Sequence, residues 1–441
     1  MVEFITKKIY KIYSEGEFAK SGQTLIRLTK HQEDEADEEK LLEGELSLAI
    51  DRCASVQKRN LTLNPRQVSL FSHFCSDLRT FNDPIDPLYI QQGQIANCGF
   101  ISALVCVLAS HHASYLARLV SNQTVRLFVS GAWVAIYCSD AALPVSTAGH
   151  FLCAHVVGSI DKRVDLLEYG NLCVFGSASY SNAHSNPVSD LVHLTGWVPE
   201  TLKLKSITFD SVINMFKRTS VMQNDHKPNA IVCIGTAGYG AETSVIETVN
   251  DEHFDPVSGI VYNHCYSVLA IDDSTQQLLL RNPWRSHAWA GYQVEAEKDK
   301  RYKGCFWIPW THMKKLPFSN VYIVWNPASF RKVVKFSSLT FHDFPVRVAI
   351  DRSQSEALLS TIIVLSRIVA PDRYSALTDW FFGLEAYADD GQLLAHTTLK
   401  NSEFLSLKTS GSVASVHLAC HTPISSTESF NLAIYYSRFS M

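Results

Sequence analysis

The chain has 441 residues, of which 46% are hydrophobic and 19% are charged, and this balance excludes wholesale disorder. Its net charge is −4, from 39 basic and 43 acidic residues, which argues against a protein that binds nucleic acid through its charge. The eleven cysteines include no CxxC pair, so the sequence favours reduced thiols in the cytoplasm over disulfides or a zinc site. The start, Met-Val-Glu-Phe, lacks the order of a secretion signal and agrees with that prediction.

The first 60 residues predict a charged, helical arm. Basic residues dominate its start, an acidic block occupies 33–39, and a leucine-rich stretch follows. Acidic residues are favoured at a helix N-terminus, so a helix is expected after this block. We expect the arm to pack on the main body, and binding of a partner protein is the alternative.

Residues 98–110 are almost entirely apolar, and two histidines end the run. A helix needs roughly 20 apolar residues to cross a membrane, so this shorter run predicts a buried helix and no transmembrane segment. Strand-like stretches follow it and predict an α+β fold; they lie at 127–137, 231–234, 266–272, 278–281 and 321–325. Residues 177–189 and 218–229 are interpreted as joints.

From about residue 327 the pattern becomes that of an all-β region. Apolar residues alternate with polar or small ones at 346–350 and again at 432–436. Asp390-Gly391 separates two strand-like stretches and predicts a hairpin. An antiparallel sandwich of about 110 residues fits this pattern.

Three residues have the types and local settings of a nucleophile, its base and a group that orients the base. Cys98 starts the apolar helix, where the helix dipole favours a thiolate. His264 lies just ahead of one strand and Asn282 ends another, so the amide oxygen is expected to accept a hydrogen bond from the imidazole. Trp284 would cover that hydrogen bond. Each residue alone is weak evidence, because most cysteines pack in the core and the chain has 17 histidines.

The motifs around these residues resemble the protease core of the calpain family of papain-like cysteine peptidases. The family's Gln-Gly-x-x-Gly-Asp-Cys-Trp stands here as Gln-Gly-Gln-Ile-Ala-Asn-Cys-Gly at 92–99. Its His-Ala-Tyr-Ser stands as His-Cys-Tyr-Ser at 264–267, and its Arg-Asn-Pro-Trp-Gly as Arg-Asn-Pro-Trp-Arg at 281–285. Lesser similarities lie at 131–134, 194–197, 289–291 and 306–308. The likeness runs over about residues 80–326, and the shared order of the motifs makes it specific.

The resemblance implies an α+β protein with a papain-like two-lobed calpain protease core, followed by an all-β C2-like sandwich. Its expected domains are the N-terminal arm at 1–60, a first lobe at 61–190, a second lobe at 191–326 and the sandwich at 327–441. The active site would lie in the cleft between the lobes, with the nucleophile on the first lobe and the base on the second.

By position, the resemblance makes Cys98 the nucleophile, His264 the general acid and base, and Asn282 the residue that orients the imidazole. Gln92 would donate to the oxyanion together with the Cys98 backbone N–H. The flanking residues expected to bind the substrate are Gly99, Asn263 and Trp284.

The chain departs from the family pattern next to the nucleophile, where Ala96, Asn97 and Gly99 replace Gly, Asp and Trp. Asn97 is nearly isosteric with Asp and is expected to keep local hydrogen bonds. The missing ring at Gly99 would open a subsite or weaken the packing of the cleft. These changes bear on catalytic efficiency, although all three catalytic side-chain types are present.

Calcium activation is not expected from this sequence. Tyr89 and Ala288 stand where calcium-regulated members have carboxylates, the oxygen ligands that calcium prefers, and only Glu295 roughly keeps such a position. The chain has no EF-hand loop. We therefore predict no metal site and no cofactor.

The sequence predicts an intracellular cysteine endopeptidase that makes limited cuts in protein or peptide substrates, independently of calcium. The alternative is a catalytically impaired calpain-fold protein that acts as a binding or scaffold module, with partner proteins bound through the arm or the sandwich. The altered residues beside Cys98 motivate this alternative, and the complete set of catalytic side chains motivates the first.

Overall fold

A computed structural model describes 23–27, 68–71, 85–93, 95–110, 115–121, 124–129, 131–138, 143–146, 153–159, 161–175, 185–216, 229–237, 247–249, 252–255, 257–286, 289, 300–340, 346–349, 360–368, 381–398, 403–410, 413–420 and 429–437. Among these residues, no helix is long and apolar enough to cross a membrane. The acidic helix expected after residue 33 lies outside the described residues. From the first 60 residues the structure describes a single strand, β1 (Gln23–Arg27), which pairs in parallel with β6.

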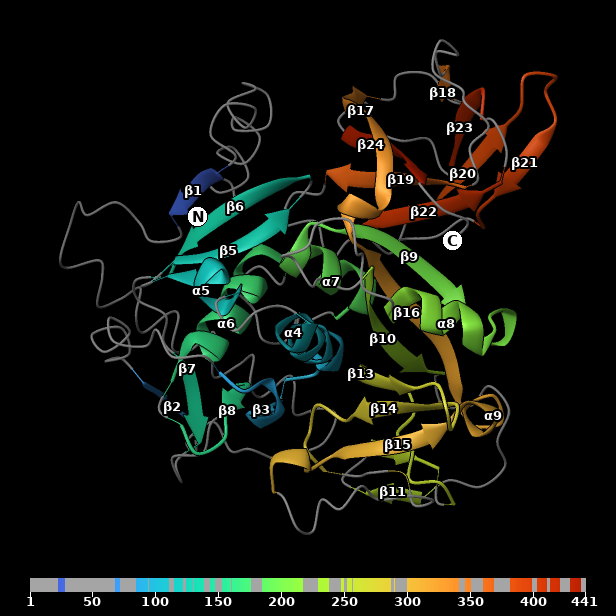
Figure 1. Cartoon of the computed structure of the whole chain (residues 1–441). Coiled ribbons are helices and arrows are strands. Elements are labelled where there is room, and N and C mark those ends of the chain that lie inside the picture. The colour runs from blue at the N-terminus through green and yellow to red at the C-terminus, as the bar shows by residue number, and fades with distance from the viewer. Residues whose placement is uncertain are drawn as a thin grey trace, which may run out of the picture.

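The first part of the core is a small sheet with helices packed along one side of it (Figure 1). The sheet has the order β1-β6-β5-β4, and its added strands are β4 (Val120–Ser121), β5 (Thr124–Val129) and β6 (Ala132–Tyr137). Two short pairs lie beside it: β2 (Val68–Phe71) with β7 (Leu143–Ser146), and β3 (Ile90–Gln91) with β8 (His155–Val156). The helices are η3 (Pro87–Tyr89), α4 (Cys98–Ser110), α5 (Tyr115–Leu119), α6 (Arg163–Phe175) and α7 (Pro187–Thr195).

Helix α4 is the buried helix that the apolar run at 98–110 predicts. Residues 99–108 are all buried, so the helix has no polar face turned to solvent. A helix that is apolar on every side is stable when other elements cover it all round. Here α7, β10 and β13 pack against it, and it begins at Cys98 as expected.

The second part of the core is a six-stranded antiparallel sheet in the order β15-β14-β13-β10-β16-β9. Its strands are β9 (Val198–Lys203), β10 (Ala230–Thr236), β13 (Cys265–Asp272), β14 (Gln277–Arg281), β15 (Cys305–Pro309) and β16 (Phe318–Trp325). The strands expected at 231–234, 266–272, 278–281 and 321–325 all lie in this sheet. Shorter elements are η5 (Leu204–Ser206), α8 (Phe209–Phe216), β11 (Glu247–Val249), β12 (Glu252–Phe254), η6 (Lys300–Tyr302) and α9 (Trp310–Met313).

Polar contacts inside the core join α4 to β13. The Ser102 hydroxyl donates to the Cys265 carbonyl at 2.9 Å, and the Ser267 hydroxyl donates to the Ser102 carbonyl at 3.0 Å. Both serines are fully buried, where an unpaired hydroxyl would be costly. These reciprocal hydrogen bonds fix the helix that begins with Cys98 against the strand that follows His264.

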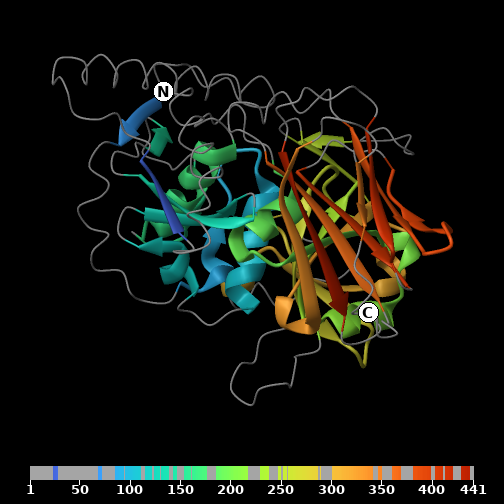
Figure 2. The ribbon, with the colours of Figure 1, turned by 90° about the horizontal axis from the view of Figure 1, so that it is seen from above.

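The C-terminal region consists of two antiparallel four-stranded sheets, grouped at one end of the molecule in Figures 1 and 2. After η7 (Pro327–Ser329), the first sheet has the order β17-β24-β19-β22, with β17 (Phe330–Thr340), β19 (Thr361–Ile368), β22 (Phe404–Thr409) and β24 (Ser429–Ser437). The second has the order β18-β23-β20-β21, with β18 (Val346–Ala349), β20 (Phe382–Tyr387), β21 (Leu393–His396) and β23 (Ser415–Cys420). The expected hairpin is confirmed, because β20 pairs with β21 and Gly391 between them has a φ of 83°.

The two sheets share a hydrophobic core of their own, to which β19, β22 and β24 of one sheet and β20 and β23 of the other contribute. This two-sheet unit is called the sandwich below. Ile362, Val364 and Phe404 of the sandwich join the core of the preceding part instead. The sandwich is therefore packed directly against the part of the molecule that carries the candidate site.

Candidate functional site

The imidazole side of the candidate site lies at the ends of two neighbouring strands. His264 immediately precedes β13, and Asn282 immediately follows the antiparallel partner β14, so the register of the sheet brings the two side chains together. The Nε2 atom of His264 lies 3.0 Å from the Asn282 Oδ1, and both residues are buried. Sequence reasoning expects this hydrogen bond, and the structure contains it.

Trp284 holds this pair from the side. Its ring lies 4.2 Å from the His264 ring between centroids, and its backbone N–H donates to the Asn282 Oδ1 at 3.0 Å. The Tyr266 ring packs edge-on against the His264 ring, with 5.1 Å between the ring centroids. The amide oxygen of Asn282 thus accepts from two directions, and the imidazole plane is fixed by aromatic rings. Trp284 covers the hydrogen bond as expected, and its contact with a substrate stays a prediction.

Asn263 is exposed directly before the histidine and has a φ of 48°. Asparagine tolerates this left-handed conformation better than most residues. Its backbone N–H donates to the Ala237 carbonyl at 2.8 Å, which ties the turn to the end of β10. The structure places Asn263 beside the site on the solvent side, and its role in substrate binding stays a prediction.

Cys98 begins α4, and its sulfur lies against the residue that directly follows His264. The pKa of the Cys98 thiol is raised to about 12, chiefly by burial and to a smaller extent by the nearby Cys265 thiol and by Asp190. Hydrogen bonds with the backbone of Cys265 and Gly99 act in the opposite direction and lower this pKa. In this arrangement the thiol is held neutral at pH 7, so a thiolate requires stabilisation by a nearby cation such as a protonated imidazole.

Gln92, the expected oxyanion donor, is buried in the loop before Cys98. Its side-chain Nε2 donates to the Ile95 carbonyl at 2.7 Å, and its backbone N–H donates to the Pro283 carbonyl at 2.9 Å. The second contact joins the loop to the segment that carries Asn282. The amide has a second N–H, which is the group that an oxyanion would engage.

Asn97 contacts a carboxylate that sequence reasoning does not single out. Its Nδ2 donates to the Glu168 Oε1 at 2.6 Å, and the other oxygen of Glu168 accepts from the Ala154 backbone N–H at 2.9 Å. An Asp at position 97 would place a second carboxylate against Glu168, whose own pKa burial already raises to about 7. The amide at position 97 is therefore the side chain that suits this partner.

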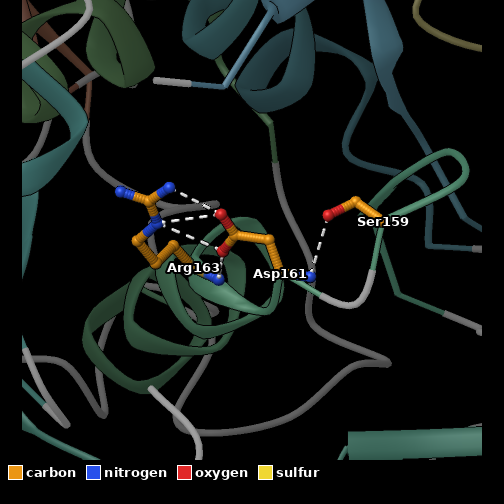
Figure 3. Close-up of polar contacts among 3 residues, drawn as sticks. All are labelled: Ser159, Asp161 and Arg163. Atoms are coloured by element: carbon orange, nitrogen blue, oxygen red, sulfur yellow. Dashed lines mark hydrogen bonds and ion pairs between the residues drawn. The ribbon is translucent and has the colours of Figure 1, made fainter. Parts of the chain in front are cut away.

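Glu168 is carried by α6, whose start is fixed by a buried ion pair (Figure 3). The Asp161 carboxylate accepts from the backbone N–H of Arg163 at 3.0 Å and from its guanidinium, with the shortest contact at 2.6 Å. The backbone N–H of Asp161 in turn donates to the Ser159 hydroxyl at 3.0 Å. A carboxylate at a helix N-terminus also interacts favourably with the helix dipole.

Gly99 packs against a loop and a helix from elsewhere in the chain. A Cβ at this position would lie 2.2 Å from the Ser185 Oγ, 2.9 Å from the Pro187 Cγ and 3.1 Å from the Asp190 Oδ2. The space next to the Gly99 Cα is therefore filled by this loop and helix. The open subsite that the sequence suggested as one outcome stays a prediction. Whether Gly99 contacts a substrate through its backbone stays a prediction.

Two arginines join the segment before Gln92 to the segment that contains Asn282. The buried Arg281 guanidinium donates to the carbonyls of Leu88 and Ile90. Arg285 lies with its guanidinium 5.0 Å from the centre of the Tyr89 ring and donates to the Lys300 carbonyl at 2.8 Å. A cation over an aromatic ring is an attractive contact.

The positive charge of Arg285 affects whether a calcium ion could bind beside Tyr89, where calcium-regulated members have a carboxylate. At Tyr89 the position beside the ring is taken by a guanidinium, and a divalent cation there would be repelled by that charge. The residues present therefore do not fit a calcium ion at this place. Among the described residues, no group of three or more His, Cys, Asp or Glu side chains is arranged to hold a metal. Ala288 and Glu295 lie outside the described residues.

The model of the calpain family cysteine proteases matches residues 64–323, more than half of the chain. The chain belongs to this family. Calpain-7 of Mus musculus is 26% identical over 317 residues, which cover 62% of this chain and 37% of that protein. Calpain-7 of Homo sapiens is 25% identical over 317 residues with the same two coverages, and the calpain-like protease palB/cpr-8 of Neurospora crassa is 27% identical over 223 residues, covering 47% and 22%.

These similarities confirm the family that the motifs indicate, a divergent calpain-like cysteine peptidase whose sequence has no EF-hand loop. The chain spans well under two thirds of the length of the curated relatives it matches. Sequence reasoning missed Glu168, Ser185 and Asp190. Ser185 lies in a stretch dismissed as a joint, and no local spacing connects any of the three to Cys98.

Proposed function

We propose that the chain is a cysteine endopeptidase that makes limited cuts in protein or peptide substrates. The observation that carries the proposal is the His264–Asn282 hydrogen bond at 3.0 Å, with the Cys98 sulfur packed against the residue after His264. The amide acceptor engages Nε2, so Nδ1 is the ring atom proposed to exchange a proton with the thiol. Membership of a protease family agrees with this reaction class.

In the proposed mechanism, Nδ1 of His264 takes the thiol proton, and the Cys98 thiolate attacks the carbonyl carbon of the scissile peptide. Gln92 and the Cys98 backbone N–H donate to the oxygen that becomes negative. His264 then gives its proton to the leaving amine, and water hydrolyses the thioester with the same imidazole as base. The protonated imidazole between these steps is the cation that offsets the effect of burial on the thiol.

We further propose that activity is independent of calcium. The support is the contact between Arg285 and Tyr89, together with the donation from Arg281 to the two carbonyls next to Tyr89. These side chains join the segment of Gln92 to that of Asn282 through fixed positive charges. Equal rates of probe labelling in excess chelator and in excess calcium would support this, and labelling that needs calcium would contradict it.

The remaining assignments are proposals of organisation and location. We propose an arm at 1–60, lobes at 61–190 and 191–326, and a C2-like sandwich at 327–441. The two sheets with their separate core support the last boundary. A cytoplasmic location is supported by the eleven cysteines, which include no CxxC pair.

A catalytically impaired binding module is the second candidate. The raised pKa of Cys98 favours this alternative, since a thiol whose pKa is about 12 is almost fully protonated at pH 7. Partner proteins would then bind to the arm or to the sandwich. The two candidates differ in whether the imidazole ionises the thiol in the folded chain.

An epoxysuccinyl probe distinguishes them, because it reacts with a cysteine activated by its site. We expect the probe to modify Cys98 in the folded wild type, as located by mass spectrometry, and to lose this reaction in His264→Ala. Cys98→Ala controls for other thiols, and denatured wild type controls for intrinsic reactivity. Absence of labelling between about pH 5 and 9 would favour the binding module.

A further inference from the structure

A series of partly buried polar contacts connects the first turn of α4 to α7. The backbone N–H of Phe100, two residues after the nucleophile, donates to the Ser185 Oγ at 2.8 Å. The Ser185 hydroxyl donates to the Asp190 Oδ2 at 2.9 Å, and Asp190 is buried in α7. The first N–H groups of a helix have no partner within the helix, so Ser185 fulfils a need that the start of α4 creates.

A second polar contact joins α7 to the sandwich, and it is linked to Asp190 through the helix itself and through the charge interaction between Asp190 and His193. His193 lies three residues after Asp190 on α7, one helical turn away, so the two side chains lie on the same face. The His193 Nε2 lies 2.8 Å from the Glu403 Oε2, and both side chains are about 3% exposed. Glu403 directly precedes β22, and its neighbour Phe404 packs its ring 6.1 Å from the His193 ring.

The start of α4 has little freedom to move away from this series. The Cα of Gly99 faces Ser185 and Pro187 so closely that even a methyl group would collide with both, and it would lie in tight contact with Asp190. The interior is close-packed here, so displacement of α7 or of Ser185 has to displace the first turn of α4. Cys98 is the first residue of that turn.

We propose that Glu403 of the sandwich is a positioning residue for the nucleophile and acts through His193, Asp190 and Ser185 on the first turn of α4. The carboxylate holds the His193 ring, His193 fixes the position of α7, and Asp190 on the same helix orients the Ser185 hydroxyl. Ser185 then fixes the Phe100 N–H and with it Cys98. In this proposal the sandwich contributes to the geometry of the site through Glu403, which lies more than 300 residues from Cys98 in the sequence.

A second contact between β22 and the core provides a matched control. Lys408, on the same strand, lies 3.7 Å from the Glu200 Oε1 and 5.8 Å from the Trp325 ring. It contacts β9 and β16 and lacks any described route to α4 through hydrogen bonds. Lys408→Met therefore removes a charged contact between the sandwich and the core without touching the proposed series.

The test is a double-mutant cycle read through the reactivity of Cys98. The variants are Glu403→Gln, Ser185→Ala, their combination and Lys408→Met, each as the full chain with its thermal midpoint measured. Iodoacetamide gives the alkylation rate of Cys98, which needs no peptidase activity, and the epoxysuccinyl probe gives a maximal inactivation rate and a half-saturating concentration. A failure of the proposed peptidase function would show in the wild type itself, as absent inactivation by the epoxysuccinyl probe, whereas a failure of the positioning proposal would show as equal iodoacetamide rates in the variants and the wild type.

We expect Glu403→Gln and Ser185→Ala each to lower the maximal inactivation rate about tenfold, because small misplacements of reacting groups are costly. The half-saturating concentration should change by less than about twofold, since substrate binding is not altered. The combination should be no slower than either single variant, because both break the same series. Lys408→Met should match wild type.

Three outcomes would overturn the proposal. These are wild-type reactivity in Glu403→Gln, effects that multiply to about 100-fold in the combination, and an equal loss in Lys408→Met. If Glu403→Gln does not fold, His193→Gln replaces it in the same cycle and leaves β22 unchanged. Ser185→Ala, at the partly exposed end of the series, also has to slow alkylation of Cys98 on its own.

Discussion

The two sides of the candidate site are built in different ways. His264, Asn282 and Trp284 are fixed by each other, at the ends of two strands paired in one sheet. Cys98 is held by its surroundings instead, through Glu168 beneath Asn97 and Ser185 beside Gly99. The imidazole side therefore depends on local sequence, and the nucleophile side depends on segments that are distant in sequence. This difference predicts where substitutions abolish activity and where they affect stability as well.

The largest effect is expected on the imidazole side, from Asn282→Ala. Loss of the Oδ1 acceptor frees the ring to rotate and removes the tautomer that points Nδ1 toward the thiol. We expect the inactivation rate by the epoxysuccinyl probe to fall between about 10²- and 10⁴-fold, the range that a positioned acid–base group contributes. The thermal midpoint should change much less than the rate, and a change confined to the half-saturating concentration would contradict this assignment.

On the nucleophile side, Asn97→Asp is expected to destabilise the fold although it restores the family's residue. The new carboxylate would replace the amide that donates to Glu168 at 2.6 Å and leave two buried acids in contact. We expect the free energy of unfolding at pH 8 to fall by about 3 kcal/mol, measured by urea titration. The double variant Asn97→Asp with Glu168→Gln should recover most of this loss, and failure to recover would show that Glu168 is not the cause.

Glu168 alone predicts a dependence of stability on pH. Burial raises its folded pKa from 4.5 to about 7, so the folded state holds a proton that the unfolded state has released between these values. Its contribution is complete below about pH 4.5 and is lost as the pH rises through about 7. Glu168→Gln resembles the protonated form and should reduce this loss between pH 5 and about pH 8 in urea titrations. An unchanged slope would contradict the raised pKa.

The sequence was sufficient for the mixed α and β character of the fold, α4, the main strands of the second sheet and the contact between His264 and Asn282. Each of these follows from periodicity or from motifs whose members lie at adjacent strand ends. The partners of Asn97 and Gly99 were not predictable in the same way. Glu168 lies 71 residues from Asn97, and Ser185 lies 85 residues from Phe100, so only the folded chain brings them together.

Gly99, the residue after Cys98, provides a further test of the packing on the nucleophile side. Gly99→Ala places a methyl group 2.2 Å from the Ser185 Oγ, and something has to move. We expect a loss of about 1–3 kcal/mol in the free energy of unfolding, as for other overpacked sites, and slower alkylation of Cys98. Adding Ser185→Ala removes the closest clash and should restore part of the stability. An additive further loss would contradict the geometry.

The smallest effect is expected from Asp190→Asn. This substitution removes the negative charge of the side chain and keeps its size and its acceptor oxygen. Burial raises the pKa of Asp190 to about 7, and His193 opposes this rise while Glu403 adds to it. The ionised carboxylate is the last of the influences that raise the pKa of Cys98, after burial and Cys265. Asparagine keeps an oxygen that accepts from Ser185, so the first turn of α4 should stay in place. The midpoint of the iodoacetamide rate against pH should then shift downward by well under about one pH unit. An upward shift would show that the carboxylate acts on Cys98 through geometry and not through charge.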